Sequence, residues 1–181
     1  MAAKMNTGQT AEIAGPKKAN VVPNPDVAAK LISRAKRPLL VIGSESTAVK
    51  TKDGDLVDTA IRVMRNEKIT VVATGHLVGE FRRRGVTKAY SMGIFVLGKH
   101  LSDPDWRGFD GLGSYDAVVF AGFPYYMEWL VESGLKNFSS LRTISLERSY
   151  QPNAEWSLGW MPEPDWKDTV DKIVSRLEEG K

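Results

Sequence analysis

The sequence predicts an α/β protein built on an open, mostly parallel, three-layer sheet. Three uninterrupted apolar runs, PLLVIG (38–43), ITVVA (69–73) and AVVFA (117–121), have the composition of strands that are buried on both faces of a parallel sheet. Segments with apolar residues at helical spacing lie between these runs. This alternation is typical of a domain in which helices cover both faces of the sheet.

Length and composition indicate one globular domain. A chain of 181 residues, 42% of them hydrophobic and 26% charged, can bury one core and needs no second domain. All apolar runs are short, and residues 1–20 lack the hydrophobic centre of a signal peptide, so we expect a soluble, cytoplasmic protein. We expect residues 1–22 to form a mobile arm and residues 23–181 to form the domain.

The first half of the domain predicts a helix, a strand, a helix and a strand. Asn24-Pro25-Asp26 supplies a capping residue, a proline at the first helical position and an acidic first turn, so a helix should run from there to just before Pro38. The strand at 38–43 leads into a polar loop, and helical spacing resumes from Asp55 to about Glu67. The connection to the strand at 69–73 should be right-handed.

The second half is less regular. Trp156 and Trp160 lie in a segment without strand or helix periodicity, so they are candidate anchors of an interface or caps on the edge of the core. The other elements that we expect are a helix near 92–101, a long loop, the strand 117–121, a helix at 125–135, a short strand at 143–146 and a final helix at 165–179.

The charge pattern argues against nucleic acid as a partner. The 25 basic and 22 acidic side chains give a dispersed net charge of +3. Arg82-Arg83-Arg84 is the one basic cluster, and it is either a solvated turn closed by Gly85 or a docking or anion contact. The two carboxylates of Asp103-Pro104-Asp105 fit a capped helix start better than an acid–base pair.

The sequence offers no ligands for a redox metal. It contains no cysteine, which excludes disulfides, thiol nucleophiles and iron–sulfur ligation within this chain. His76 and His100 have no second histidine at metal-binding spacing. Any redox metal that this protein serves must therefore sit in another chain.

Ligands of a parallel α/β sheet bind at the carboxyl ends of the strands, where the strand order reverses. Three loops, 43–46, 74–76 and 122–126, are expected at that edge. Without GxGxxG or GxxxxGK[ST], the glycine after the first strand opens either a phosphate-binding turn or an ordinary turn, and Glu45 would repel an anion. The candidate cofactor-binding residues are Gly43, Ser44, Ser46, Thr74, Gly75, Gly122 and Tyr125.

Aromatic residues cluster after the third buried strand. Phe123, Tyr125, Tyr126 and Trp129 could stack on a flat ring such as a flavin, anchor a partner, or pack at the start of a helix. Tyr126 joins Trp156 and Trp160 as a candidate interface residue.

Four segments resemble the epsilon subunit of the archaeal acetyl-CoA decarbonylase/synthase, or carbon monoxide dehydrogenase, complex. The first of them, at 28–45, is also similar to the middle domain of thiamine diphosphate enzymes, whereas DPDWxGxDGxGxYD and KNFS are more specific. The segments are AAKLISRAKRPLLVIGSE (28–45), VVATGH (71–76), LSDPDWRGFDGLGSYDAVVFAG (101–122) with the two tyrosines that follow it, and LKNFSSLRTISLERSYQPNA (135–154).

The resemblance implies a Rossmann-like domain of the NAD- or FAD-binding class that includes deoxyhypusine synthase. It implies a non-catalytic accessory subunit that binds and stabilises the nickel–iron–sulfur alpha subunit in an alpha2-epsilon2 assembly. The dispersed charge and the short apolar runs add the expectation that neither nucleic acid nor a membrane is a partner. Assistance in electron transfer to a flavin such as FAD is a further expectation, and the metal clusters would reside in the partner alone. The alternative is a free-standing electron-transfer protein that binds flavin or NAD.

Overall fold

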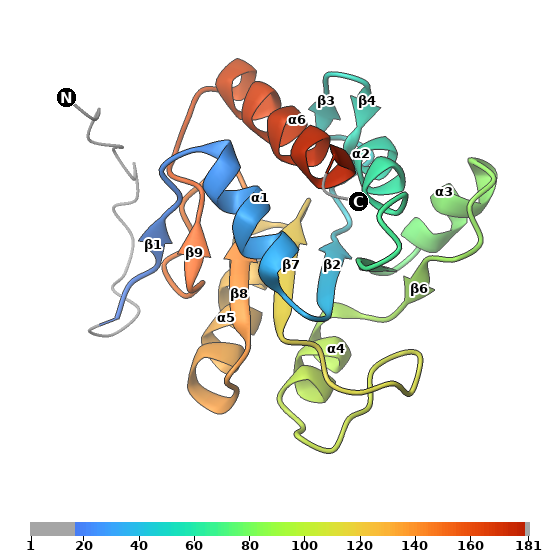
Figure 1. Ribbon diagram of the computed structural model, residues 1–181, viewed down its shortest axis with the longest axis vertical. Coiled ribbons are helices and arrows are strands. Elements are labelled where there is room, and N and C mark those ends of the chain that lie inside the picture. Colours follow the sequence, from blue (N-terminus) through green and yellow to red (C-terminus); the bar gives the residue numbers. More distant parts are fainter. Residues whose placement is uncertain (1–16, 180–181) are drawn as a thin grey trace.

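The computed structural model describes residues 17–179 and contains a seven-stranded sheet between two layers of helices (Figure 1). The sheet strands are β1 (Asn20–Val21), β2 (Pro38–Ile42), β5 (Thr70–Ala73), β6 (Tyr90–Ser91), β7 (Ala117–Ala121), β8 (Arg142–Ser145) and β9 (Trp156–Ser157). Two further strands, β3 (Lys50–Thr51) and β4 (Gly54–Asp55), form a separate antiparallel hairpin. The helices are α1 (Pro25–Arg34), α2 (Leu56–Val63), α3 (Leu77–Arg83), α4 (Ile94–Leu101), α5 (Tyr125–Phe138) and α6 (Glu163–Glu179).

The direction in which the chain adds strands to the sheet reverses between β2 and β7. All neighbouring strands of the order β1-β9-β8-β7-β2-β5-β6 are parallel. From β2 the chain proceeds outward through β5 to β6, and it then returns to the other side of β2 to form β7, β8 and β9. The loops that follow β2 and β7 therefore flank the crevice in which such sheets bind ligands. The predicted three-layer, Rossmann-like parallel fold is confirmed.

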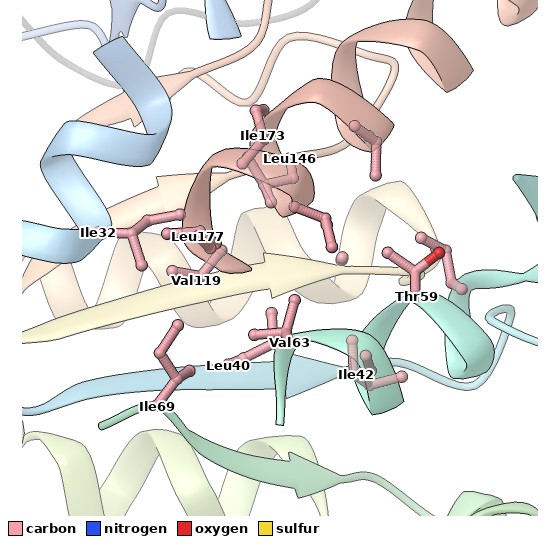
Figure 2. Close-up of a pocket in the computed structure, with 15 residues that line it drawn as sticks. Ile32, Leu40, Ile42, Thr59, Val63, Ile69, Val119, Leu146, Ile173 and Leu177 are labelled. Carbon is pink, nitrogen blue, oxygen red and sulfur yellow. The ribbon is translucent and has the colours of Figure 1, made fainter. Parts of the chain in front are cut away.

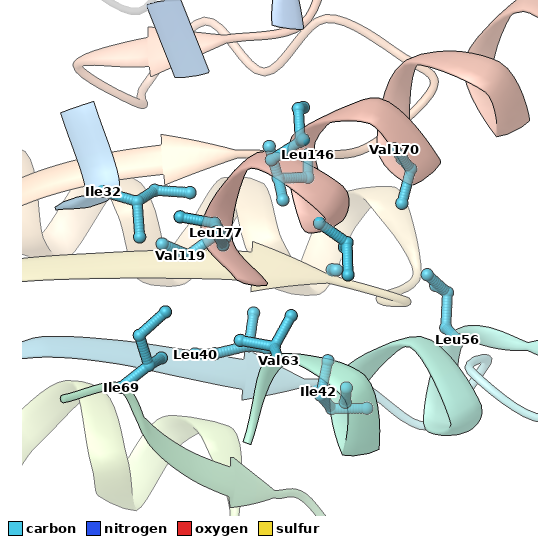
Figure 3. Packing of buried hydrophobic residues seen from close by; sticks show 14 of the residues in the cluster. Ile32, Leu40, Ile42, Leu56, Val63, Ile69, Val119, Leu146, Val170 and Leu177 are labelled. Carbon is cyan, nitrogen blue, oxygen red and sulfur yellow. The ribbon is translucent and has the colours of Figure 1, made fainter. Parts of the chain in front are cut away.

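Alternate residues of each buried strand enter two separate cores. Leu40 and Ile42 of β2 pack against α1, α2 and α6, whereas Leu39 and Val41 pack against α4 and α5. Figure 3 shows the first of these cores, and Figure 1 shows α1 and α6 lying across the same face of the sheet. This burial on both faces is the reason that the strand sequence is continuously apolar.

The first core contains a small cavity between the sheet and the helices α1, α2 and α6 (Figure 2). Its volume is about 30 Å³, and aliphatic side chains form almost all of its wall. The Thr59 hydroxyl in the wall already donates to the Asp55 carbonyl at 3.1 Å. A site this small and apolar offers no partners to water or to a polar ligand, so the cavity is a packing defect and not a binding site.

The elements with strong periodicity are confirmed, and the short ones were not predicted. Asn24 caps α1 by accepting a hydrogen bond from the Val27 amide at 3.0 Å, as the sequence predicts. The β3–β4 hairpin, α3, β6 and β9 are absent from the prediction because each is only two to seven residues long. Asp103-Pro104-Asp105 forms a turn, in which the Asp105 amide donates to the Asp103 carboxylate at 2.9 Å, but no helix starts there.

The predicted arm at 1–22 extends too far into the chain. Residues 1–16 lie outside the described part of the structure. Asn20 and Val21 form β1, which pairs with β9, and both Ala19 and Val22 are buried. The boundary at residue 22 is therefore wrong, because pairing with a strand about 135 residues later orders this segment.

Arg84, in the predicted basic cluster, holds α3 against α2. Its guanidinium lies 2.6 Å from carboxylate oxygens of both Asp55 and Asp58. Asp55 also caps α2 by accepting the amides of Val57 and Asp58. This arginine therefore has a structural role within the chain.

Among the helices of the described region, none is both long enough and apolar enough to cross a bilayer.

Candidate functional site

The loops that follow β2 and β7 are bound tightly to each other at the crevice. The Glu45 amide donates to the Gly122 carbonyl at 2.9 Å, and the Gly43 amide donates to Ala121 at 2.9 Å. A Cβ atom on Gly43 would lie 2.3 Å from the Gly122 oxygen. Gly43 is therefore required by the close approach of the two loops, and its amide is not free to bind a phosphate. Of the two readings of this glycine, the structure supports the ordinary turn.

Several of the other predicted cofactor-binding residues also hold these loops together. Gly122 adopts φ of +79°, and a Cβ on it would lie 2.0 Å from the Ser46 hydroxyl oxygen. Ser46 is fully buried and donates to the Gly43 carbonyl at 2.7 Å. The Thr74 hydroxyl donates to the Ile42 carbonyl at 3.1 Å. The Ser46 and Thr74 hydroxyls therefore already donate hydrogen bonds within the protein.

The remaining candidates are divided between two hollows, and Phe123 contributes to the wall of both. The larger cavity, about 390 Å³, is lined by Tyr125 together with Glu45, Glu147, Arg148 and Trp166, among others. A hollow of about 300 Å³ contains Ser44, Thr74 and Gly75 in its wall, opposite the first turn of α4. The seven predicted residues therefore do not form one site.

Glu147 occupies the position where an anion would bind. It follows β8, and its carboxylate accepts a hydrogen bond from the Phe123 amide at 3.0 Å and a second one from the Gly122 amide. Two successive backbone amides at the end of a parallel strand are a typical cradle for phosphate oxygens. In this chain the protein's own carboxylate fills the cradle.

The environment of Glu147 favours its protonated form. The residue is partly exposed at the cavity wall, but protein atoms surround its carboxyl group closely, and this burial raises its pKa to about 7. The two amide hydrogen bonds oppose the shift, whereas the negative charge of Glu45 adds to it. Glu147 therefore takes up or releases a proton near neutral pH, at the wall of the larger cavity.

Two further carboxyl groups lie behind Glu147, on the inner side of α5. Glu128 and Glu132 are both fully buried, and no ion pair between described residues neutralises either carboxyl group. Burial, joined by the negative charge of Glu147, raises the pKa of both groups well above the ordinary value. Burial without a cationic partner therefore favours the neutral form of both groups.

The three carboxyl groups form a proton-binding cluster that extends from the cavity into the core. A protonated carboxyl gains a donor, and Glu128 and Glu132 lie close enough for one to donate to the other. None of the three carboxyl groups was predicted from the sequence as part of a site. The spacing of Glu128 and Glu132, one helical turn apart on the side of α5 that also carries Leu135, was the available signal.

The remaining site predictions have mixed outcomes. Among the described residues, no group of three histidine or carboxylate side chains is arranged to hold a metal ion. Tyr126 and Trp160 are exposed, and Trp156 is half-buried against the first core. Their role as interface anchors stays a prediction.

Comparisons with known proteins show the family of this chain. A family described as "CO dehydrogenase beta subunit/acetyl-CoA synthase epsilon subunit" matches residues 4–174. The acetyl-CoA decarbonylase/synthase complex subunit epsilon 1 of Methanosarcina barkeri is 37% identical over 154 residues, which is 85% of this chain and 87% of the relative. The epsilon subunit of Methanothrix soehngenii is 35% identical over 94% of this chain and 90% of its own length. This chain belongs to the family of CO dehydrogenase beta and acetyl-CoA synthase epsilon subunits.

Proposed function

We propose that this chain is a non-catalytic accessory subunit that binds and stabilises the nickel–iron–sulfur alpha subunit of a carbon monoxide dehydrogenase complex, in an alpha2-epsilon2 assembly in the cytoplasm. Family membership supports a place in a multi-subunit complex, because the relatives are named as epsilon subunits of the acetyl-CoA decarbonylase/synthase complex. The position of Glu147 is the observation that most supports a non-catalytic role. Its carboxylate fills the amide cradle in which α/β enzymes hold a phosphate.

The stabilising role can be tested with the two purified subunits. The alpha subunit is heated alone, with an equimolar amount of this chain, or with the same mass of serum albumin, and carbon monoxide oxidation is followed over time. Binding to the folded alpha subunit should slow its inactivation, because a ligand of the native state shifts the unfolding equilibrium. Equal inactivation in all three samples would contradict the proposal.

Binding of a flavin such as FAD, with electron transfer to it, is a second candidate function. The 390 Å³ cavity favours it, because this volume is within the range of small-molecule sites and because Tyr125 and Trp166 line the wall. As arranged, Glu45 and Glu147 do not fit a pyrophosphate group. Flavin binding therefore requires Glu147 to leave the amides of Gly122 and Phe123.

A titration distinguishes this candidate from the first. FAD is added to the wild-type chain and to Glu147→Ala, and quenching of tryptophan fluorescence is measured, with Trp166→Phe as the control for the cavity. Saturable quenching that Glu147→Ala strengthens would support a flavin site. If millimolar FAD leaves both proteins unchanged, the chain has no flavin function of its own.

A further inference from the structure

The carboxylate of Glu147 has one oxygen atom that the protein does not use. The hydrogen bonds from the Gly122 and Phe123 amides both end on its Oε1 atom, and no described residue donates a hydrogen bond to Oε2. Glu147 lines the 390 Å³ cavity and is partly exposed there. Its second oxygen can therefore accept a hydrogen bond from a molecule that enters the cavity.

A second acceptor without a partner belongs to Gln151, in the wall of the same cavity. This residue is fully buried, and its side-chain nitrogen donates to the Tyr125 carbonyl at 3.1 Å. The Oε1 atom of Gln151 has no hydrogen-bond partner within the described part of the chain. A buried amide oxygen without a donor costs free energy, so this position points to a donor that the chain itself does not supply.

Glu45 adds a negative charge to this group of acceptors. It is exposed at the cavity wall, near enough to Glu147 for its charge to raise the pKa of that residue. Of the ion pairs that described residues form, none includes Glu45 or Glu147. Two carboxylates and an amide oxygen without a cation between them are complementary to a positively charged donor.

The size and the aromatic wall of the cavity favour an organic cation over a metal ion. A volume of about 390 Å³ is within the range of small-molecule sites. The rings of Tyr125 and Trp166 line the wall, and such rings attract ammonium groups. An ammonium group has three donors, which match the three acceptors of the wall.

Two basic side chains in the same wall specify the other end of the ligand. Lys50 and Arg148 are exposed there, and neither forms an ion pair with a described residue, although Lys50 donates to the Thr47 carbonyl at 3.3 Å. The third acid of the wall, Glu163, lies 2.7 Å from Lys167, and Arg148 is a weaker electrostatic neighbour of it. These two cations would repel a simple amine, whereas an acidic group on the ligand would complement them.

We infer that the 390 Å³ cavity binds a small zwitterion that carries one ammonium group and one acidic group. The ammonium group donates to Glu45, Glu147 and Gln151, and the acidic group lies beside Lys50 and Arg148. This ligand differs in class from a flavin. Its binding does not depend on association with the alpha subunit, so the inference and the proposed function can fail separately.

Isothermal titration calorimetry of the full chain tests the site with a series of unbranched amino acids in phosphate buffer, which contains no amine. The series is glycine, β-alanine, 4-aminobutyrate, 5-aminopentanoate and 6-aminohexanoate, so that it varies the distance between the two charged groups. The alkylamine and the alkanoate of each length are the ligand controls. At least one amino acid should bind about tenfold or more tightly than both of its controls, because only the zwitterion pairs with both parts of the wall.

Substitutions locate the ammonium group within the cavity. Glu147→Gln should raise the dissociation constant at least about tenfold, as expected when a charged hydrogen-bond partner is lost. Glu45→Gln changes an exposed position and should raise it about threefold. Glu67→Gln is the matched control, because Glu67 is exposed near the amino end of β5, outside the cavity, and this variant should bind like wild type. Circular dichroism confirms that each variant is folded.

The pH dependence gives a second readout. Glu147, with a pKa of about 7, must release its proton to accept the ammonium group, so the affinity of the wild-type chain should rise about tenfold from pH 6 to pH 8. Comparison with Glu147→Gln, which should lack this dependence, separates Glu147 from the other charged and titratable groups around it. These are Glu45 after β2, Lys50 on β3, Glu128 and Glu132 on α5, Arg148 after β8 and Glu163 on α6.

Three results would overturn the inference. The first is the absence of saturable heat throughout the amino acid series. The second is equal affinity for each amino acid and its alkylamine, which would show that the basic side chains do not select the ligand. The third is binding that Glu147→Gln and Glu67→Gln change equally, because the ammonium group would then lie elsewhere on the protein.

Discussion

Glu147→Gln tests the protonation state of the carboxylate that fills the amide cradle. In the folded chain the pKa of Glu147 is about 7, compared with an ordinary value of 4.5. Between these two pH values the folded chain holds a proton that the unfolded chain has released. Folding takes up a proton in this range, so the free energy of unfolding should fall as the pH rises through it.

The size of this effect follows from the two pKa values. At about 1.4 kcal/mol per pH unit, the difference between the two pKa values corresponds to at most about 3.5 kcal/mol, and contact with solvent at the cavity wall reduces it to about 2–3 kcal/mol. Glutamine keeps an oxygen that can accept the amides of Gly122 and Phe123, but it does not titrate. Relative to wild type, Glu147→Gln should therefore gain about 2–3 kcal/mol of stability between pH 5 and pH 8.

Urea unfolding at pH 5, 6, 7 and 8, followed by tryptophan fluorescence, measures the difference in the free energy of unfolding between Glu147→Gln and wild type. Glu45→Gln is the matched control, because it removes the nearby charge that raises the pKa of Glu147 but leaves that group able to titrate. In this control the fall in stability should begin at the same pH, because the unfolded pKa is unchanged, but it should be smaller and end at lower pH. Parallel stability profiles for Glu147→Gln and wild type would show that Glu147 is ionised throughout and would refute the reasoning.

Three further substitutions test the packing. Glu132→Leu replaces a buried carboxyl group that has no cationic partner and should raise stability at pH 8 by about 1–3 kcal/mol in urea unfolding, whereas a loss would show that its hydrogen bond with Glu128 stabilises the fold. Gly43→Ala should lower the free energy of unfolding by about 2 kcal/mol or more, because the added Cβ meets the Gly122 oxygen. The control Gly79→Ala places a Cβ in open space on α3 and should be neutral or stabilising. Equal effects of the two substitutions would contradict the close approach of the loops. Ile173→Ala enlarges the cavity between the sheet and α6 and should cost about 3–4 kcal/mol by calorimetry, so a cost below about 1 kcal/mol would show that the core can collapse around it.

The sequence predicted the elements whose burial is continuous or periodic. PLLVI and AVVFA have both faces buried, so their composition alone identified β2 and β7, and regular spacing identified α1, α2, α5 and α6. β1 and β9 were missed because two residues cannot display a period. Their pairing depends on a contact between Asn20 and Trp156, far apart in the chain.

The seven candidate residues stay a prediction as a cofactor site, although hydrogen bonds within the protein already engage Gly43, Ser46 and Thr74. Glycines and hydroxyl residues after buried strands indicate a turn or a phosphate loop equally well, and only the distance from Gly43 to Gly122 separates the two. Glu147 could not be identified because the amides that it binds belong to a loop about 25 residues earlier. The inward orientation of Glu128 likewise depends on which face of α5 meets the sheet.

Affinity capture of a tagged copy from its native cells, followed by gel filtration with iron and nickel analysis of the eluted peak, most directly tests whether this chain is an accessory subunit. The chain should elute with a large partner that contains iron and nickel, identified as the alpha subunit by mass spectrometry. Elution as a metal-free monomer or small oligomer, with no such partner, would contradict the proposed function.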